Sequence, residues 1–411
     1  MAKRRVVVTG LGLITPVGNG VQDSWKNILN GVSGITNITK FDATTFKSQV
    51  AGEVKNFDPN LYLDVKDSRR MDTFIQFGLV AGIEAIKDSG FEITEENSER
   101  IGVSIGSGIG GINLIEKTSD IFDQGGSRKI SPFFVPGTII NMISGNLSIM
   151  YGLKGPNISI VTACTTGTHS IGDASRIIEY GDADIMIAGG SEAAITELTV
   201  AGFSAAKALT QRNEDPKTAS RPWDKDRDGF VIGEGAGVMI LEEYEHAKKR
   251  DAKIYCELSG YGMSADAYHI TAPSVDGPKR SMINAINNAG ININEVDYIN
   301  AHGTSTQIGD LNEVNAIKET FNDHANNLIV NSTKSMTGHL LGGAGGIESV
   351  FTVLAICNQI SPPTINIFNQ DPECDLDYCA NEAREIEIKA ALKNNFGFGG
   401  TNGSLVFKRV K

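Results

Sequence analysis

The sequence predicts an α/β fold built from two related halves. Short β-branched and apolar runs alternate with segments of helical periodicity along the whole chain. Many of the 46 glycines follow directly after the apolar runs, where strand-to-helix turns often need a backbone without a Cβ atom. Two pairs of segments also resemble each other across the chain. Together these observations predict one compact body that arose by internal duplication.

The repeated segments place the joint between the halves near residue 250. The strand-and-turn segments 6–12 and 255–262 form the first pair. In the second pair, 170 residues apart, Thr162, His169, Gly172 and Ala174 align with Ser332, His339, Gly342 and Ala344. The charged run 242–251 favours a boundary there. We therefore expect an N-terminal half at 1–250 and a C-terminal half at 251–411, with no low-complexity linker between them.

Helical periodicity predicts helices over 72–89, 172–180, 277–289 and 310–320. The apolar runs 296–301 and 328–331 are typical of strands, and the apolar, β-branched run that begins at Ile158 predicts a buried strand that ends in Cys164.

Composition narrows the classes of protein. The chain has 411 residues, of which 40% are hydrophobic and 21% charged, as in an ordinary globular protein. No segment approaches the roughly 18 consecutive apolar residues of a membrane span, and the apolar run after the basic tip Met1–Lys3 is too short for a signal peptide. Five scattered cysteines predict a reducing cytoplasm. The net charge of −12 argues against a general nucleic-acid binder, so an acidic partner would need a local basic patch.

Cys164 lies where a strand meets a helix in the predicted order of elements. Its sulfur is therefore expected near the positive end of the following helix, where backbone N–H groups favour thiolate over thiol. A cysteine in that position is a candidate nucleophile. The alternative is a small buried apolar residue, since free cysteine is among the most buried residue types. The segment alone leaves both interpretations open.

Two histidines also follow predicted strands. His302 comes directly after 296–301, and His339 follows the segment 328–338 and precedes a glycine-rich helix start. Open α/β sheets build their sites beyond the ends of such strands. One histidine there is more often a satisfied polar group, but two of them with Cys164 favour a catalytic site. No cofactor or metal is expected: the glycine motif 106–111 lacks its following acid, and Cys374 and Cys379 lack ligand spacing.

Four blocks resemble the β-ketoacyl-acyl carrier protein synthases: 161–167, 300–306, 331–339 and 394–402, in the family's order. The resemblance runs from about residue 5 to residue 408. It implies the thiolase fold, with duplicated βαβαβαββ halves in a five-layer αβαβα sandwich. The pair His302 and His339 resembles the elongating Cys-His-His class, and the chain is most similar to its bacterial synthase II group.

This resemblance implies a decarboxylative Claisen condensation. Cys164 would take an acyl chain as a thioester, and malonyl-acyl carrier protein would lose CO2 and extend that chain by two carbons in fatty-acid synthesis. A thiolase would need a second cysteine where this chain has Phe396-Gly397-Phe398-Gly399. A polyketide-type ketosynthase, a thiolase- or thioesterase-like acyl transferase, and a non-catalytic partner subunit are the alternatives; Cys164 argues against the last.

The resemblance also implies roles for further residues. Lys334 and Glu348 would orient and support the histidines, and the backbone N–H groups of Cys164 and Phe398 would form an oxyanion hole. The residues implied in substrate binding are Thr304 and Thr306 for the pantetheine arm, Ile109 and Phe203 for the acyl pocket, Phe398 as its gate, and Phe396. Carrier-protein docking would fall to Lys66, Arg69, Arg70, Arg128, Lys129 and Lys207. The family resemblance further implies a homodimer.

Overall fold

The computed structural model describes residues 4–410, so the basic tip Met1–Lys3 lies outside the described residues. The first half of the main sheet contains β1 (Val6–Thr15), β5 (Ile101–Gly106), β6 (Asn157–Ile158), β7 (Ile185–Glu192) and β9 (Gly235–Glu243). The second half contains β10 (Cys256–Ala265), β11 (Tyr298–Asn300), β12 (Ile329–Asn331), β15 (Ala390–Gly397) and β16 (Thr401–Lys408).

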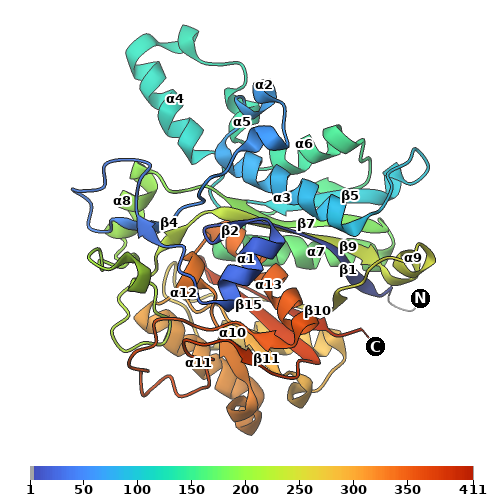
Figure 1. Cartoon of the computed structure of the whole chain (residues 1–411), viewed down its shortest axis with the longest axis vertical. Helices are drawn as coiled ribbons and strands as arrows, with labels where there is room; N and C mark the ends of the chain where they lie inside the picture. The colour runs from blue at the N-terminus through green and yellow to red at the C-terminus, as the bar shows by residue number, and fades with distance from the viewer. Residues whose placement is uncertain (1–3, 411) are drawn as a thin grey trace.

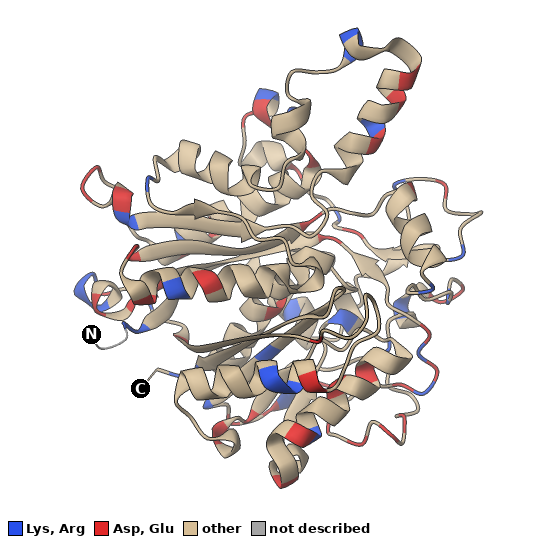
Figure 2. Cartoon of the chain, turned by 180° about the vertical axis from the view of Figure 1, so that it is seen from behind, with Lys and Arg blue, Asp and Glu red and all other residues tan. Residues whose placement is uncertain are grey.

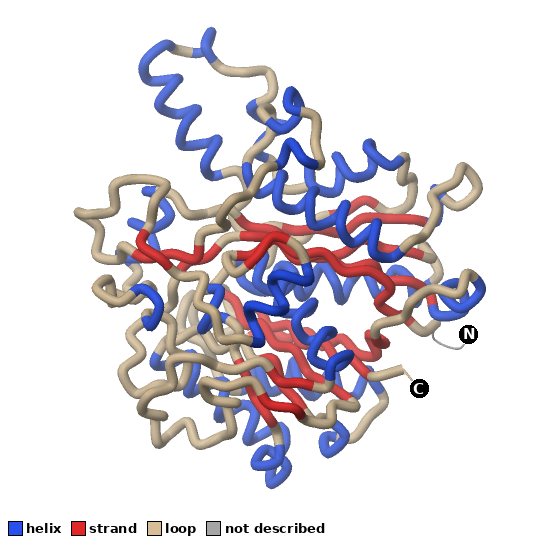
Figure 3. Tube along the Cα trace, viewed as in Figure 1, coloured by secondary structure: helices blue, strands red, loops and turns tan. Residues whose placement is uncertain are grey.

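Helices cover both faces of these two sheet halves (Figure 1, Figure 3). The outer layer on the first half contains α3 (Thr73–Ser89) and α6 (Met142–Tyr151), and that on the second half contains α10 (Asp276–Ala289) and α11 (Gln307–Phe321). Helices α7 (Thr166–Tyr180) and α13 (Ala344–Asn358) lie between the two halves of the sheet. The order of layers is therefore αβαβα, which confirms the expected five-layer sandwich.

The remaining helices are shorter or peripheral: α1 (Val21–Leu29), α2 (Val65–Ser68), α4 (Ile112–Gly125), α5 (Phe134–Thr138), α8 (Glu197–Ala205), α9 (Tyr244–Lys249) and α12 (Lys334–Thr337). Two 3-10 turns flank helices of the fold: η3 (Ser127–Lys129) follows α4, and η4 (Ala163–Thr165) precedes α7.

Strand order shows the duplication directly. The first half reads β6-β5-β7-β9-β1 and the second reads β12-β11-β15-β16-β10. If each half is numbered by its own strands, both orders are 3-2-4-5-1. The halves join where β1 pairs antiparallel with β10, through Val7 opposite Glu257 and Val8 opposite Cys256. The repeat between 6–12 and 255–262 therefore consists of two equivalent first strands. A division at residue 250, between β9 and β10, stays a prediction.

The predicted helices are present, with shifted ends. Helix α3 begins where expected because the Asp72 carboxylate caps it by accepting from the Phe74 N–H, and it ends at Gly90 in the left-handed conformation. Helix α7 begins at Thr166, earlier than the expected 172. The equivalent helix α13 begins at Ala344, so the 170-residue offset of the second repeat does not continue into these helices.

The run from Ile158 to Cys164 is not the buried strand that its apolar and β-branched residues predicted. Only Asn157 and Ile158 form a strand, β6, which lies at the edge of the sheet. Ile158 and Val161 are 37% and 53% exposed. A β-branched run is equally suited to a core and to an exposed sheet edge, so pattern alone did not separate the two.

The middle layer places the two halves in backbone contact. A Cβ atom on Gly167 of α7 would lie 2.5 Å from the amide nitrogen of Gly346, and one on Gly345 of α13 would lie 2.2 Å from that of Thr168. Only glycine allows the first turns of α7 and α13 to approach this closely. The contact brings the residues before α7, which include Cys164, beside those before α13, which include His339.

Helix α13, with the turn before it, is long and apolar enough to be compared with a membrane span. In the described part of the chain, Leu341–Asn358 is the one helical segment that is long and apolar enough to cross a membrane. Because it contains Glu348, Ser349 and Thr352, it is not a run of consecutive apolar residues, so it does not contradict the expectation that no such run approaches the roughly 18 residues of a membrane span. The segment is 89% buried inside the protein, and it packs in the middle layer against α7 and both sheet halves. Its apolar character is that of a core helix.

Candidate active site

Cys164 sits in η4, immediately before α7, and is 9% exposed. The turn is sharp because Ala163 has a φ of +49°, in the left-handed region that non-glycine residues rarely adopt. Two hydrogen bonds hold it: the Thr162 N–H donates to Thr166 Oγ1 at 2.9 Å, and Thr166 Oγ1 donates to the Ala163 carbonyl at 2.8 Å. The predicted position of Cys164 at a helix N-terminus is therefore present, although a 3-10 turn rather than a long strand leads to it.

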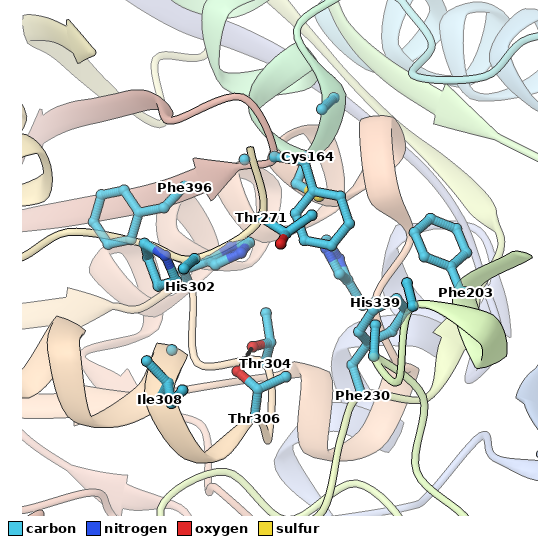
Figure 4. A pocket seen from close by; sticks show the side chains of 18 of the residues that line it. Cys164, Phe203, Phe230, Thr271, His302, Thr304, Thr306, Ile308, His339 and Phe396 are labelled. Atoms are coloured by element: carbon cyan, nitrogen blue, oxygen red, sulfur yellow. Dashed lines mark hydrogen bonds between the residues drawn. The ribbon is translucent and has the colours of Figure 1, made fainter. Parts of the chain in front are cut away.

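A pocket of about 560 Å³ opens at Cys164. Figure 4 shows His302 and His339 pointing into the same space from the second half of the fold, with Thr304 and Thr306 across from them. The predicted residues that line it are Ile109, Cys164, Phe203, His302, Thr304, Thr306, His339, Phe396, Phe398 and Lys207. Its size and its mixture of apolar walls with a few polar groups are typical of an organic-ligand site.

Cys164 rests as a thiol. Burial raises the pKa of this thiol to about 11, and this effect outweighs the nearby Lys334 ammonium and the Phe398 N–H, which both favour the thiolate. The sequence-based expectation that the helix end favours the thiolate of Cys164 over the thiol is therefore wrong. Desolvation in a closed pocket was invisible to an argument made from the helix end alone.

Alkylation of Cys164 should consequently depend steeply on pH. Below a pKa of about 11 the thiolate fraction grows about tenfold per pH unit, so the rate of modification by iodoacetamide should rise continuously from pH 7 to pH 10. Intact-mass spectrometry at successive times measures this rate, and Cys164→Ala supplies the background from the exposed Cys357. A rate that is already constant at pH 7 would contradict a raised pKa.

The tautomer of His302 is set by two donors at Nδ1. The Lys334 ammonium lies 3.5 Å away and the Asn395 side-chain amide 3.1 Å away. The amide of Asn395 has a fixed orientation because its oxygen accepts from Thr168 Oγ1 at 2.6 Å. Since Nδ1 accepts, the proton of neutral His302 is on Nε2, on the opposite side of the ring. His302 is therefore a hydrogen-bond donor toward the pocket.

His339 has the same tautomer for a different reason. Its Nδ1 accepts from the Leu341 N–H at 3.3 Å, so Nε2 carries the proton. The ring stands nearly perpendicular to that of His302, at 87° with centroids 5.2 Å apart, and edge-on to Phe230 at 5.2 Å. Two N–H donors thus converge on one region of the pocket.

Both histidines are neutral. Burial first, and the nearby Lys334 and Lys393 ammonium groups in addition, hold the pKa of His302 and His339 well below the ordinary value. Neutral rings with a protonated Nε2 donate hydrogen bonds to developing negative charge but are poor acids and bases at neutral pH.

A buried ionic cluster supports His302 from behind. The Lys334 ammonium donates to the His302 carbonyl at 2.6 Å and pairs with Glu348, whose other oxygen lies 3.0 Å from the Lys393 ammonium. All three ionic side chains are at most 1% exposed. Burial lowers the pKa of Lys393 to about 8. The predicted supporting roles of Lys334 and Glu348 agree with these contacts for His302, whereas His339 is oriented by the Leu341 backbone.

The remaining predicted pocket residues lie together at the mouth and along the walls. Thr304 Oγ1 and Thr306 Oγ1 are 3.0 Å apart and both line the pocket. Phe398 is 39% exposed, and its ring lies 6.2 Å from that of Phe203. Phe398 stands in the turn between β15 and β16, and its N–H faces the Cys164 sulfur. The predicted residues therefore lie at one pocket, with an aromatic side chain at its opening, and their roles in binding an acyl chain stay predictions.

The predicted docking residues lie in three places. Lys207 lines the pocket, whereas Lys66, Arg69 and Arg70 belong to the α2 region, and Arg128 and Lys129 belong to η3 at the end of the arm that α4 forms. Figure 2 shows basic residues on α2 and at the tip of this arm. The Arg70 guanidinium lies 4.0 Å above the Phe133 ring and therefore already makes a cation–π contact within the chain.

Sequence reasoning missed several buried polar residues around the site. Lys393 and Asn395 on β15 complete the ionic cluster, and Glu313 on α11 accepts from the N–H groups of His302 and Gly303, both at 2.8 Å. Burial raises the pKa of Glu313 to about 7. Glu192 at the end of β7 binds two pocket loops. A lysine in a strand and a glutamate in a helix are usually exposed to solvent, so nothing in the local sequence distinguished these buried residues from ordinary surface residues.

The chain matches two family models. Residues 3–247 match the model described as beta-ketoacyl synthase, N-terminal domain, and residues 255–368 match that described as beta-ketoacyl synthase, C-terminal domain. Together they cover most of the chain.

Curated relatives match over the full length. The chain is 58% identical to 3-oxoacyl-acyl-carrier-protein synthase 2 of Vibrio harveyi over 413 residues, with 100% of both chains covered. It is 58% identical to the protein of that name from Coxiella burnetii, also with 100% of both covered. It is 52% identical to the one from Staphylococcus aureus strain COL, with 99% of each covered.

Solved structures share the fold. One is a type II PKS acyl-carrier protein in complex with its ketosynthase bound to the hexaketide, with a TM-score of 0.92, 38% identity and 100% of both chains covered. Another is a beta-ketoacyl synthase from Burkholderia phymatum, with a TM-score of 0.92 and 33% identity, covering 99% of this chain and 100% of that one.

Proposed function

The chain belongs to the beta-ketoacyl synthase family, and we propose that Cys164, His302 and His339 are the residues that carry its reaction. The activity is that of a chain-elongating condensing enzyme, an acyltransferase of fatty-acid synthesis. It joins an enzyme-bound acyl chain to malonyl-acyl carrier protein and releases CO2 and a 3-oxoacyl chain two carbons longer. The observation that carries the assignment of residues is the convergence of one thiol and two neutral N–H donors on one pocket.

In the first half-reaction, Cys164 Sγ attacks the thioester carbonyl of the acyl-loaded carrier. The N–H of Phe398 faces this sulfur, and with the N–H of Cys164 it would stabilise the oxyanion of the tetrahedral intermediate. The carbon–sulfur bond to the carrier then breaks. The proton of the Cys164 thiol passes to the departing pantetheine sulfur, so no separate base is consumed.

In the second half-reaction, malonyl-acyl carrier protein binds with its pantetheine arm against Thr304 and Thr306. The bond to the carboxylate breaks, CO2 leaves, and the electron pair forms an enolate. The Nε2–H groups of His302 and His339 donate to the enolate oxygen. The carbanion attacks the acyl carbonyl on Cys164 and forms the new carbon–carbon bond. The carbon–sulfur bond to Cys164 then breaks, and the released thiolate takes a proton from water.

Intact-mass analysis with acyl-acyl carrier protein tests the assignment. The native chain should gain the mass of one acyl group, and subsequent malonyl-acyl carrier protein should remove it with release of CO2. Cys164→Ala should form no adduct. An adduct that persists in Cys164→Ala, or a native chain that forms none, would refute the role of Cys164.

A polyketide-type activity is the second candidate. The likeness to a polyketide ketosynthase at 38% identity supports it, but the curated synthase 2 relatives are 58% identical over the whole chain. We therefore place fatty-acid elongation first. Repeated extension of one unreduced chain in the adduct experiment would favour the polyketide alternative.

Acyl carrier protein is the proposed macromolecular partner, docked by the basic residues of α2, η3 and Lys207. A ketosynthase with a similar fold is known in complex with its acyl-carrier protein. The double change Arg69→Glu/Arg70→Glu should raise KM for acyl-carrier substrates about tenfold and leave reaction with a small acyl thioester unchanged. Steady-state kinetics with both substrates measures this difference.

Lys389→Glu is the matched control, because Lys389 precedes β15 at the end opposite the pocket and its side chain is 68% exposed. It should leave KM for the carrier substrate unchanged. Equal loss on the carrier and on the small thioester in the double variant would show a fault in folding rather than in docking.

A homodimer is proposed from an exposed apolar face next to the edge strand β6. Its members are Ile115, Ile121, Phe122, Phe133, Val135, Ile139, Ile149, Met150, Ile158 and Val161. An unpaired strand edge bordered by exposed apolar side chains favours burial against another chain. Ile158 and Val161 directly precede the Cys164 turn, so a second copy there would also brace the nucleophile. Light scattering of the purified protein measures the stoichiometry.

The cytoplasm is the proposed location, since all five cysteines are free thiols. We further propose that 1–250 and 251–411 are the two halves of one catalytic unit, the first carrying the nucleophile and the second both histidines.

A further inference from the structure

Glu192 is a fully buried carboxylate that the reaction steps above do not use. It ends β7 and accepts hydrogen bonds from two separate loops. Its Oε1 accepts from Ser107 Oγ at 2.7 Å and from the Ile109 N–H at 3.1 Å. Its Oε2 accepts from the Gly108 N–H at 2.8 Å and from the Gly342 N–H at 2.9 Å. One side chain therefore holds backbone from both halves of the fold.

Each loop contributes to a different part of the site. The loop 107–110 supplies Ile109 to the acyl pocket. In the other loop, Gly342 follows Leu341, whose N–H fixes the tautomer of His339. Leu341 has a φ of +47°, a strained conformation that persists only where its neighbours enforce it. The hydrogen bond from Gly342 to Glu192 is such a constraint.

The two loops leave no room for side chains at their contact. A Cβ atom on Gly342 would lie 2.2 Å from the Gly108 amide nitrogen and 2.9 Å from Glu192 Oε2. A Cβ atom on Gly108 would lie 2.7 Å from the same oxygen. The backbones of the two loops therefore meet at the Glu192 carboxylate.

We propose that Glu192 is a positioning residue that couples the acyl-pocket loop at Ile109 to the turn that orients His339. The inference deepens the proposed function and rests on it. Through this residue, the fit of the acyl chain and the orientation of the enolate-binding histidine are linked. Loss of the carboxylate should therefore disturb both half-reactions, although Glu192 does not line the pocket.

The test compares Glu192→Gln with Ser107→Ala. A glutamine must turn its NH2 group either toward the Ile109 N–H or toward the N–H groups of Gly108 and Gly342, so one of the two oxygen positions no longer accepts from the backbone. Acyl-adduct formation should lose its native preference between long and short chains, and CO2 release from malonyl-acyl carrier protein without acyl primer should fall about tenfold or more. Ser107→Ala removes a single donor and keeps the carboxylate, and it should stay within about twofold of wild type in both assays.

The outcomes are separable. A folded Glu192→Gln protein with native chain preference and native CO2 release would overturn the coupling, as would a change in only one assay. If that variant does not fold, Gly342→Ala parts the same two loops with the carboxylate intact, and the same paired change is expected. A wild-type chain that forms no acyl adduct would instead contradict the proposed function, independently of Glu192.

Discussion

Replacing His302 or His339 by alanine should lower the rate of CO2 release from malonyl-acyl carrier protein about 10²- to 10³-fold. Each substitution removes one Nε2–H donor from the developing enolate, and the loss of one such donor typically costs that factor. Acyl-adduct formation on Cys164 should continue, because the backbone N–H groups of Cys164 and Phe398 remain. Radiolabelled CO2 release and intact-mass analysis measure the two steps separately.

The pH dependence of CO2 release adds an independent check on the histidines. Their pKa values lie well below 6.5, so both rings stay neutral donors from neutral pH down past pH 6.5. Wild-type CO2 release should show no histidine titration between pH 6 and pH 8. A decline centred near pH 6.5 that disappears in His302→Ala or His339→Ala would show that a ring is protonated in that range, contrary to the structure.

Glu348→Gln should lower the free energy of unfolding by about 3–5 kcal/mol at pH 7, because it leaves the buried ammonium groups of Lys334 and Lys393 without their shared carboxylate. The change keeps the size of the side chain, so the loss reports on charge. Activity should fall with it, since Lys334 and Asn395, which both contact Glu348, fix the tautomer of His302. Urea denaturation at several pH values measures the stability.

The stability that Glu348→Gln loses relative to the native chain should become smaller as the pH rises. The folded-state pKa of Lys393 is about 8, below its ordinary 10.5, and Glu348 is a group that holds it up. The unfolded chain therefore binds more protons than the folded one between these values, and stability rises with pH across that window. Without Glu348 the folded-state pKa of Lys393 should fall further, so the pH range over which stability rises begins at a lower pH. The variant should therefore recover part of its stability between pH 7 and pH 10.

A second substitution provides the control. Glu348→Gln/Lys393→Met removes one of the two unpaired cations and should recover part of the stability at pH 7. A loss that is identical at pH 7 and pH 10, and that Lys393→Met does not reduce, would contradict the electrostatic explanation.

The sequence predicted those parts of the site whose residues stand in recognisable local patterns. In the sequence, Cys164, His302 and His339 each follow a predicted strand, so their convergence beyond the strand ends was expected from the fold class. Lys393 and Glu192 had no such pattern. Their roles come from partners far away in the chain, such as Thr168 for Lys393 and Gly342 for Glu192, and only the folded structure brings these together.

Two of the errors have physical reasons of the same kind. Ile158 and Val161 looked like core because an exposed apolar sheet edge and a buried strand share one composition. The Cys164 thiol looked ionised because the helix end is visible in a sequence whereas the depth of the surrounding pocket is not. In both cases the sequence revealed the local element and concealed its surroundings.

The glycine contact between α7 and α13 limits how this enzyme can diversify. The nucleophile and His339 are separated by a spacing set between main-chain atoms, at Gly167, Gly345 and Gly346. A change of rotamer or of side-chain size cannot adjust the distance between the two main chains in small steps. The spacing between Cys164 and His339 should therefore stay constant among related sequences. Variation in substrate must then accumulate in the loops around the pocket, where a side chain can change without moving either helix.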